Sequence, residues 1–269
     1  MLFIIGGISI MLCLFVWINQ NNLMPAANKS KSIVQLLDTL DTKKMTICQT
    51  ADTMGNMTNI AVGNQYLANP IVKQFIDAGL CDVQQKNNTL KVQLRYATND
   101  NFAHKSLYGP LNKCFLHPQA AAKLQKAQDI LQQQHPNYSL LLLDCARPHA
   151  IQKKMWDIVK NTPQRKYIAP PSTRSMHNYG MAVDITIVDV ANNVELDMGT
   201  PYDYFGPKAQ PRYEQQFLKE KQLTSQHLQN RHLLKNVMKQ AGFRPILLEW
   251  WHFEASTKDY ARKNCQLLP

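Results

Sequence analysis

The distribution of apolar and polar positions predicts alternating strands and helices along most of the chain. Residues 90–96 alternate between apolar and polar side chains, as a half-buried strand does. Residues 139–145 instead form a continuous apolar run that is typical of a buried strand. Similar patterns predict strands at 182–189 and 245–253, and helical spacing predicts helices at 71–79, 118–131, 151–159 and 231–240. Strands and helices follow no regular β-α-β order. The sequence therefore predicts an α+β fold with a mainly antiparallel sheet flanked by helices.

The N-terminal region predicts an exported protein. Residues 1–19 contain an uncharged, mostly apolar run from Leu2 to Ile18. This run is long for the core of a signal peptide and short for a bilayer span of roughly 20 residues, so a cleaved signal peptide and a retained membrane anchor both fit it. Either one predicts a protein that is periplasmic or tethered to the outer face of the inner membrane. We expect residues 20–82 to form a polar linker and an N-terminal extension of unassigned role, and residues 83–269 to form the catalytic domain.

The distribution of charge along the sequence indicates which binding partners to expect. The formal net charge is +11, but lysines and arginines occur singly or in short pairs. We expect no nucleic-acid partner, because no basic stripe is interleaved with aromatic residues. A diffuse positive surface suits surroundings of anionic polymers or lipid.

Five of the six cysteines follow Cys13, and they lie at positions 48, 81, 114, 145 and 265. An odd number leaves at least one of them without a partner in this set, and none has the neighbours of a catalytic thiol. Export favours one or two disulfides, with Cys48–Cys81 as the first pair to test. Buried free thiols are the alternative.

Two short segments carry the chemistry. The first contains His177 and, seven residues later, Asp184; the second contains Glu249 and His252. Two histidines and one acidic residue form a ligand set of zinc hydrolases, which leave one coordination position for water. We predict that His177, Asp184 and His252 hold one zinc ion and that Glu249 is the base. Glu249 and His252 would face opposite sides of a flat strand, so this prediction requires a bulge or turn between them.

The expected mechanism follows from these groups. Zinc lowers the pKa of its water from 15.7 toward ~7. Glu249 then takes the proton and passes it to the departing amine. The negative oxygen of the tetrahedral intermediate needs a fixed positive donor, for which Arg147 is the candidate because it directly follows a buried strand. A simple pairing of Arg147 with a surface carboxylate is the alternative.

The motif Ser-x-His-x-x-Gly-x-Ala-x-Asp, followed by Glu-x-x-His and preceded by Arg-Pro, resembles the zinc D-alanyl-D-alanine dipeptidases. This family includes the vancomycin-resistance dipeptidases and is related to D,D-carboxypeptidases and the hedgehog signalling domain. The resemblance spans about residues 90 to 256. It implies zinc on His177, Asp184 and His252, with Glu249 as the base and Arg147 as the arginine that stabilises the transition state.

The resemblance also implies a substrate pocket around Tyr96, Ser175 and Asp203, in which Asp203 faces the ammonium group of a free dipeptide. The implied function is hydrolysis of D-Ala-D-Ala to D-alanine, in the turnover of cell-wall dipeptides or in glycopeptide resistance. The segment before residue 80 has no counterpart in the family.

Two other functions remain open from the sequence. One is a D,D-carboxypeptidase or endopeptidase that acts on peptidoglycan peptides, which a pocket open beyond Asp203 would support. The other is a zinc-bearing binding module without catalysis, as in the signalling relatives of this fold. The presence of both Glu249 and Arg147 argues against a binding module, because a binder needs neither a base nor an oxyanion donor.

Overall fold

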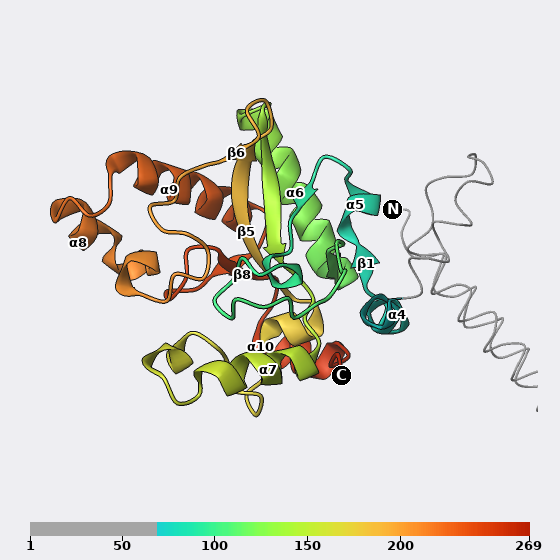
Figure 1. Ribbon diagram of the computed structural model, residues 1–269. Coiled ribbons are helices and arrows are strands. Elements are labelled where there is room, and N and C mark those ends of the chain that lie inside the picture. Colours follow the sequence, from blue (N-terminus) through green and yellow to red (C-terminus); the bar gives the residue numbers. More distant parts are fainter. Residues whose placement is uncertain (1–68) are drawn as a thin grey trace, which may run out of the picture. The chain divides into compact units, whose positions relative to one another are not determined.

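The computed structural model describes residues 69–269, so the predicted leader and most of the predicted extension lie outside the described residues. The helices are α4 (Pro70–Asp77), α5 (Val83–Lys86), α6 (Pro118–Gln134), α7 (His149–Val159), α8 (Glu214–Lys219), α9 (Ser225–Gln240) and α10 (Lys258–Asn264) (Figure 1). The strands are β1 (Cys81–Asp82), β2 (Lys91–Val92), β3 (Phe115–Leu116), β4 (Tyr138–Asp144), β5 (Ala182–Asp189), β6 (Val194–Glu195), β7 (Arg244–Pro245) and β8 (His252–Glu254). Short 3-10 helices include η1 (Arg95–Ala97), η2 (Pro163–Lys166) and η3 (Met176–Tyr179).

The main sheet has the order β2-β4-β5-β8-β7, with β6 paired to β5, and β1 pairs with β3 in a separate two-stranded sheet. Within the described residues, β2 and β4 pair in parallel and the other pairs are antiparallel. Strands β4 and β5 are the longest and are buried along almost their whole length. The predicted α+β class with a mainly antiparallel sheet is confirmed.

Helix α6 packs against β4, and α9 packs against α6. Figure 1 shows α7 and α10 toward the end of the sheet where β4 stops. The start of α6 follows from its sequence. The ring of His117 accepts a hydrogen bond from the backbone of Gln119, and Pro118 occupies the first turn, where its missing N–H costs nothing. The predicted apolar face of α6 is buried, including Leu124 and Leu131.

The helix predicted at 71–79 is α4, and it packs against the domain. The ring of Phe75 lies 5.4 Å from the ring of Phe115, and the first residue of β1, Cys81, pairs with Leu116. Both elements precede residue 83, where the sequence places the start of the catalytic domain. The folded unit therefore extends N-terminal to that residue.

Three predicted elements differ from the structure. The segment 245–253 is not one strand, because residues 246–251 form a loop between β7 and β8. The strand predicted at 90–96 is reduced to β2, and Tyr96 lies in η1. The helix predicted at 231–240 starts earlier, because α9 begins at Ser225. Thr224 and His227 form a reciprocal capping box that fixes this start, and the polar first turn has no apolar periodicity from which it could be predicted.

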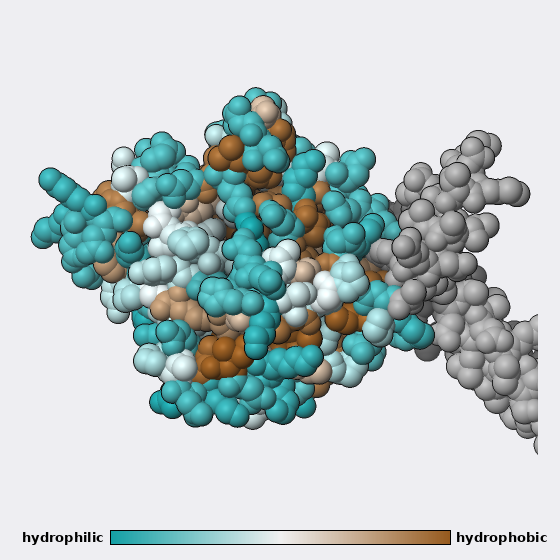
Figure 2. Space-filling model, in the orientation of Figure 1, coloured by the Kyte–Doolittle hydropathy of each residue, from teal (hydrophilic) through white to brown (hydrophobic). Residues whose placement is uncertain are grey.

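The surface of the described part is mostly hydrophilic on the face shown in Figure 2, with apolar areas separated by polar ones. No helix within residues 69–269 is long and apolar enough to cross a membrane.

Candidate metal centre and active site

Three separate elements bring the predicted metal ligands together. His177 lies in η3, Asp184 in β5 and His252 at the first position of β8, where it is the cross-strand partner of Asp184. Gly180 ends η3 with a φ of 62°, a left-handed conformation that glycine adopts without strain, and this turn leads the chain into β5. A Cβ atom at Gly180 would lie 2.9 Å from the backbone nitrogen of His117, so the turn is also tightly packed.

One donor atom from each ligand faces the other two. Nε2 of His177 lies 3.2 Å from Nδ1 of His252 and 3.3 Å from Oδ1 of Asp184, and the last two atoms are 2.9 Å apart. Ligands at 2.0–2.1 Å from a tetrahedral zinc ion would lie about 3.3 Å from one another, so the spacing suits such an ion. The three side chains are buried. Lone pairs that converge in a buried site are unfavourable without a cation or a proton between them.

The outer atoms of two ligands have partners that orient them. Nδ1 of His177 lies 2.6 Å from the carbonyl oxygen of Cys145, to which it donates, and this leaves the Nε2 lone pair for the metal. The hydroxyl of Tyr202 donates to Oδ2 of Asp184 at 2.9 Å, so Oδ1 alone faces the histidines. Burial by itself would raise the pKa of Asp184, but His177 and His252 hold it well below its usual range. Asp184 is therefore a carboxylate, the form in which it could bind a metal ion.

Glu249 lies in the loop before β8, which is the turn that the sequence requires between this residue and His252. Its side chain is buried and lines the same cavity as the three ligands. Burial, followed by repulsion from Asp184 and Asp203, raises the pKa of Glu249 well above its usual value. A raised pKa makes the Glu249 carboxylate more basic, which favours transfer of a proton from water to it.

Arg147 follows β4 and is held by buried partners. Its Nε donates to Oδ2 of Asp144 at 3.0 Å, its Nη2 contacts the same oxygen, and its Nη1 donates to Oε1 of Gln152 at 2.7 Å. The guanidinium carbon lies 5.3 Å from the centre of the Tyr96 ring, and Nη2 is 3.8 Å from Oδ2 of Asp184. The alternative of a surface pairing is wrong, because Asp144 is completely buried.

The three predicted substrate residues line the same cavity of about 260 Å³, together with Glu249 and Arg147. The hydroxyl of Tyr96 donates to Oδ1 of Asp203 at 3.0 Å. Ser175 caps η3 by accepting a hydrogen bond from the backbone of His177, so its hydroxyl also fixes the turn that carries this ligand. All eight predicted site residues therefore border one cavity.

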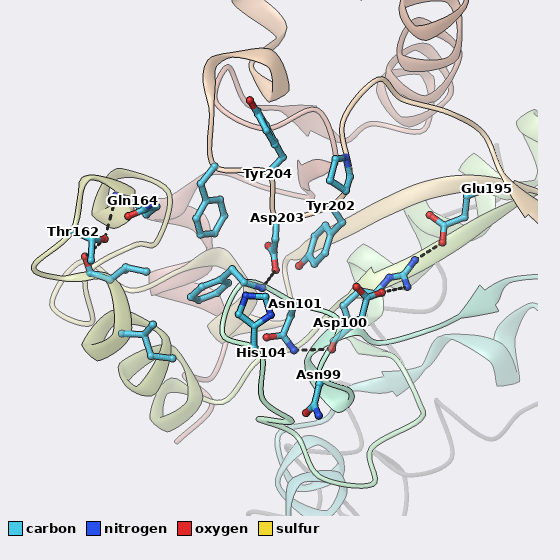
Figure 3. Close-up of a pocket in the computed structure, with 16 residues that line it drawn as sticks. Asn99, Asp100, Asn101, His104, Thr162, Gln164, Glu195, Tyr202, Asp203 and Tyr204 are labelled. Carbon is cyan, nitrogen blue, oxygen red and sulfur yellow. Dashed lines mark hydrogen bonds and ion pairs between the residues drawn. The ribbon is translucent and has the colours of Figure 1, made fainter.

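A larger cavity of about 660 Å³ adjoins the first, and Asp203 borders both (Figure 3). Figure 3 shows the Asp203 carboxylate pointing toward the loop at 99–104, where the backbone N–H of Phe102 donates to its Oδ2 at 3.1 Å. Burial raises the pKa of Asp203 to about 7, although hydrogen bonds from Phe102 and Tyr96 act against this shift.

The sequence did not indicate three features of the site. Asp144 orients Arg147 and also accepts a hydrogen bond of 2.6 Å from Tyr108, but it stands at the end of an apolar run with no motif around it. Tyr202 is adjacent to Asp203 within the family-like segment, and this was the available signal for its contact with Asp184.

The third unpredicted feature is a disulfide between Cys114 and Cys145. Cys48 lies outside the described residues, so the Cys48–Cys81 pair stays a prediction, and Cys265 is a free thiol.

Sequence comparison finds D-alanyl-D-alanine dipeptidases among the relatives of the chain. The relatives include the D-alanyl-D-alanine dipeptidases of Escherichia coli K12, which is 32% identical over 165 residues (61% of this chain and 78% of the relative), and of Enterococcus faecium, which is 25% identical over 185 residues (62% and 86%). A protein of the same name from Synechocystis is 28% identical over 177 residues (55% and 71%).

Residues 76–267 match the peptidase family described as D-ala-D-ala dipeptidase, which is a family of metallopeptidases. The match covers most of the chain and includes every predicted site residue. The chain therefore belongs to the D-ala-D-ala dipeptidase family of peptidases.

Proposed function

We propose that the protein is a zinc-dependent dipeptidase that hydrolyses free D-Ala-D-Ala to D-alanine. The observation that carries this proposal is the arrangement of two histidines and one aspartate, with donor atoms 2.9–3.3 Å apart, in a cavity that also contains Glu249 and Arg147. The names of the relatives supply the dipeptide.

The donor set supports zinc as the metal. Two imidazoles and one carboxylate, with space left for a further ligand, form a common set for catalytic zinc. Bound there, zinc would act as a Lewis acid that makes water more acidic and polarises the peptide carbonyl.

The side chains of the chain have distinct tasks in this reaction. Glu249 accepts a proton from the attacking water as the new C–O bond forms at the peptide carbonyl. It then delivers this proton to the peptide nitrogen as the tetrahedral intermediate collapses and the C–N bond breaks. The guanidinium of Arg147, fixed by Asp144 and Gln152, donates to the negative oxygen of the tetrahedral intermediate. Because these donors are fixed before the substrate binds, little reorganisation is needed in the transition state.

Asp203 binds the substrate ammonium in this proposal. A carboxylate accepts charge-assisted hydrogen bonds from an ammonium group, and the hydroxyl of Tyr96 keeps that carboxylate oriented. The cavity of about 260 Å³ is smaller than the roughly 300–1,000 Å³ of most drug-sized ligand sites, which suits a dipeptide.

We further propose that the protein acts outside the cytoplasm, where it degrades dipeptide released from cell-wall turnover or acts in glycopeptide resistance. The apolar run at residues 2–18 supports export or tethering to the membrane. The Cys114–Cys145 disulfide also supports it, because disulfides persist in oxidising compartments.

The test is an assay of the purified, zinc-loaded protein with D-Ala-D-Ala, L-Ala-L-Ala and N-acetyl-D-Ala-D-Ala. We expect hydrolysis of D-Ala-D-Ala alone, because the L isomer presents its methyl groups differently and the acetylated form has no ammonium for Asp203. Equal rates for the free and acetylated dipeptides would contradict the role of Asp203. If none of the three dipeptides is hydrolysed, the proposed function is wrong.

One observation favours a second candidate function, the removal of D-alanine from longer peptides. The cavity of about 660 Å³ also borders Asp203, so a peptide extended at its amino end could continue into it. Release of D-alanine from a pentapeptide that ends in D-Ala-D-Ala, at a rate comparable with that of the free dipeptide, would favour this candidate.

A further inference from the structure

The Cys114–Cys145 disulfide lies directly behind the metal ligands. Both cysteines are buried, and the carbonyl oxygen of Cys145 is the atom that accepts the 2.6 Å hydrogen bond from Nδ1 of His177. Cys145 follows Asp144 directly and lies two residues before Arg147, and these two residues form a buried ion pair. The disulfide is therefore attached to the residue whose carbonyl orients His177, between the two members of that pair.

The backbone at Cys145 leaves the main sheet. The β4–β5 ladder shows a register shift between Leu142 and Asp144, and β4 ends at Asp144. Beyond that point, the N–H of Ala146 donates to the carbonyl of Phe115 at 3.0 Å, and the N–H of Arg147 donates to the carbonyl of His177 at 3.0 Å. The disulfide joins this segment to a residue 31 positions earlier in the chain, next to β3.

We propose that this disulfide is a positioning element of the metal site, and that its formation raises the affinity of the protein for zinc. This proposal rests on the proposed metal function of His177, Asp184 and His252. The carbonyl of Cys145 selects the ring tautomer of His177 and fixes the plane of its ring, and the disulfide fixes the carbonyl. Loss of a partner that orients a metal ligand typically weakens metal binding about 10- to 100-fold.

The consequence is a dependence of activity on the redox compartment. The bond forms when a disulfide-bonded exchange partner takes two electrons and two protons from the two thiols: a mixed disulfide forms first, and the second thiol displaces the reduced partner. Cytoplasmic thiol pools keep such cysteines reduced, whereas exported proteins meet oxidising partners. If the chain is exported as proposed, it binds zinc about 10- to 100-fold more weakly before export than after it, which favours hydrolysis in the outer compartment.

The test compares the zinc affinity of the full-length oxidised protein with that of the C114A/C145A variant, by competition with a chromophoric chelator at pH 7. We expect an affinity about 10- to 100-fold lower for the variant. Cys265→Ala removes a free thiol and should leave the affinity unchanged. Leu131→Ala removes a buried side chain of α6, so it should lower stability without changing the affinity of the folded state.

A second measurement covers the case in which the double variant does not fold. The zinc-loaded native protein is treated with a phosphine reductant, and zinc transfer to the chelator is followed after mass spectrometry shows that Cys114–Cys145 is reduced. Faster transfer is expected. Equal affinities for the oxidised protein and the variant, or transfer that reduction does not accelerate, would overturn the positioning role. If neither form binds zinc, the proposed metal function itself fails.

Discussion

Replacement of Asp203 by asparagine tests substrate recognition with little disturbance of the backbone. Asp203 has a φ of 59°, a left-handed conformation in which asparagine is well tolerated and alanine is strained. The asparagine carbonyl can accept from the N–H of Phe102, as Oδ2 does now. Its amide group then faces the hydroxyl of Tyr96, which can rotate to accept. The variant therefore removes the negative charge and keeps both contacts, with the direction of the Tyr96 hydrogen bond reversed.

The expected cost is that of one hydrogen bond between charged groups. Such a bond is worth about 1.5–3 kcal/mol, which corresponds to roughly a 10- to 150-fold change in binding. Because the ammonium contacts Asp203 both in the bound dipeptide and in the transition state, the loss should raise KM and change kcat much less. The preference for free over acetylated dipeptide should fall by the same factor.

The same substitution should weaken substrate binding but increase the stability of the folded protein above pH 7. Burial raises the pKa of Asp203 to about 7, so between pH ~4 and ~7 the folded protein keeps a proton that the unfolded chain releases. The free energy of unfolding of the metal-free protein should therefore fall as the pH rises through this range. Asp203→Asn should remove this contribution and be more stable than the wild type above pH 7.

Two assays measure these effects: steady-state kinetics with D-Ala-D-Ala, and urea unfolding of the metal-free proteins at several pH values. An unchanged KM would refute the ammonium contact. A stability difference between the two proteins that does not vary with pH would refute the raised pKa.

Three further substitutions test individual parts of the site. Glu249→Gln should lower kcat about 10²- to 10⁴-fold, because the base is lost, while metal analysis finds zinc still bound; unchanged turnover would exclude Glu249 as the base. Tyr202→Phe removes the hydroxyl that fixes Asp184 and should weaken zinc binding about 10- to 100-fold in a chelator competition, and equal affinities would show that the contact has no orienting effect. Gly180→Ala forces a positive φ on alanine and brings its Cβ to within 2.9 Å of the backbone of His117, so it should destabilise the protein by roughly 1 kcal/mol or more in urea unfolding; an unshifted midpoint would contradict this packing.

The cluster of His177, Asp184 and His252 was predictable because local sequence determines most of its geometry. Ser175 caps a short turn, Gly180 ends it, and His177 and Asp184 are thereby placed a fixed distance apart. The requirement for a turn between Glu249 and His252 also followed from the two-residue period of a strand. The structure satisfies this requirement with a loop.

The residues that support the site could not be found in this way. Asp144 lies only three residues before Arg147, but it ends an apolar run with no motif around it. Tyr202 contacts Asp184, 18 residues away, and its place beside Asp203 indicates the segment but not that contact. Cysteine pairing likewise depends on which segments the fold brings together, so spacing alone did not indicate Cys114–Cys145. The strand predicted at 245–253 is wrong because its apolar residues line the site and the core from a loop, where burial produces a strand-like pattern without a strand ladder.

Zinc titration of the metal-free protein tests most directly whether His177, Asp184 and His252 hold a catalytic metal. Hydrolysis of D-Ala-D-Ala is measured as zinc is added to the wild type and to His252→Ala. The wild type should be inactive without metal and reach full activity at one zinc ion per chain, while the variant should stay inactive over the same range. Full hydrolysis by the metal-free wild type, or a wild-type titration curve for His252→Ala, would contradict the account.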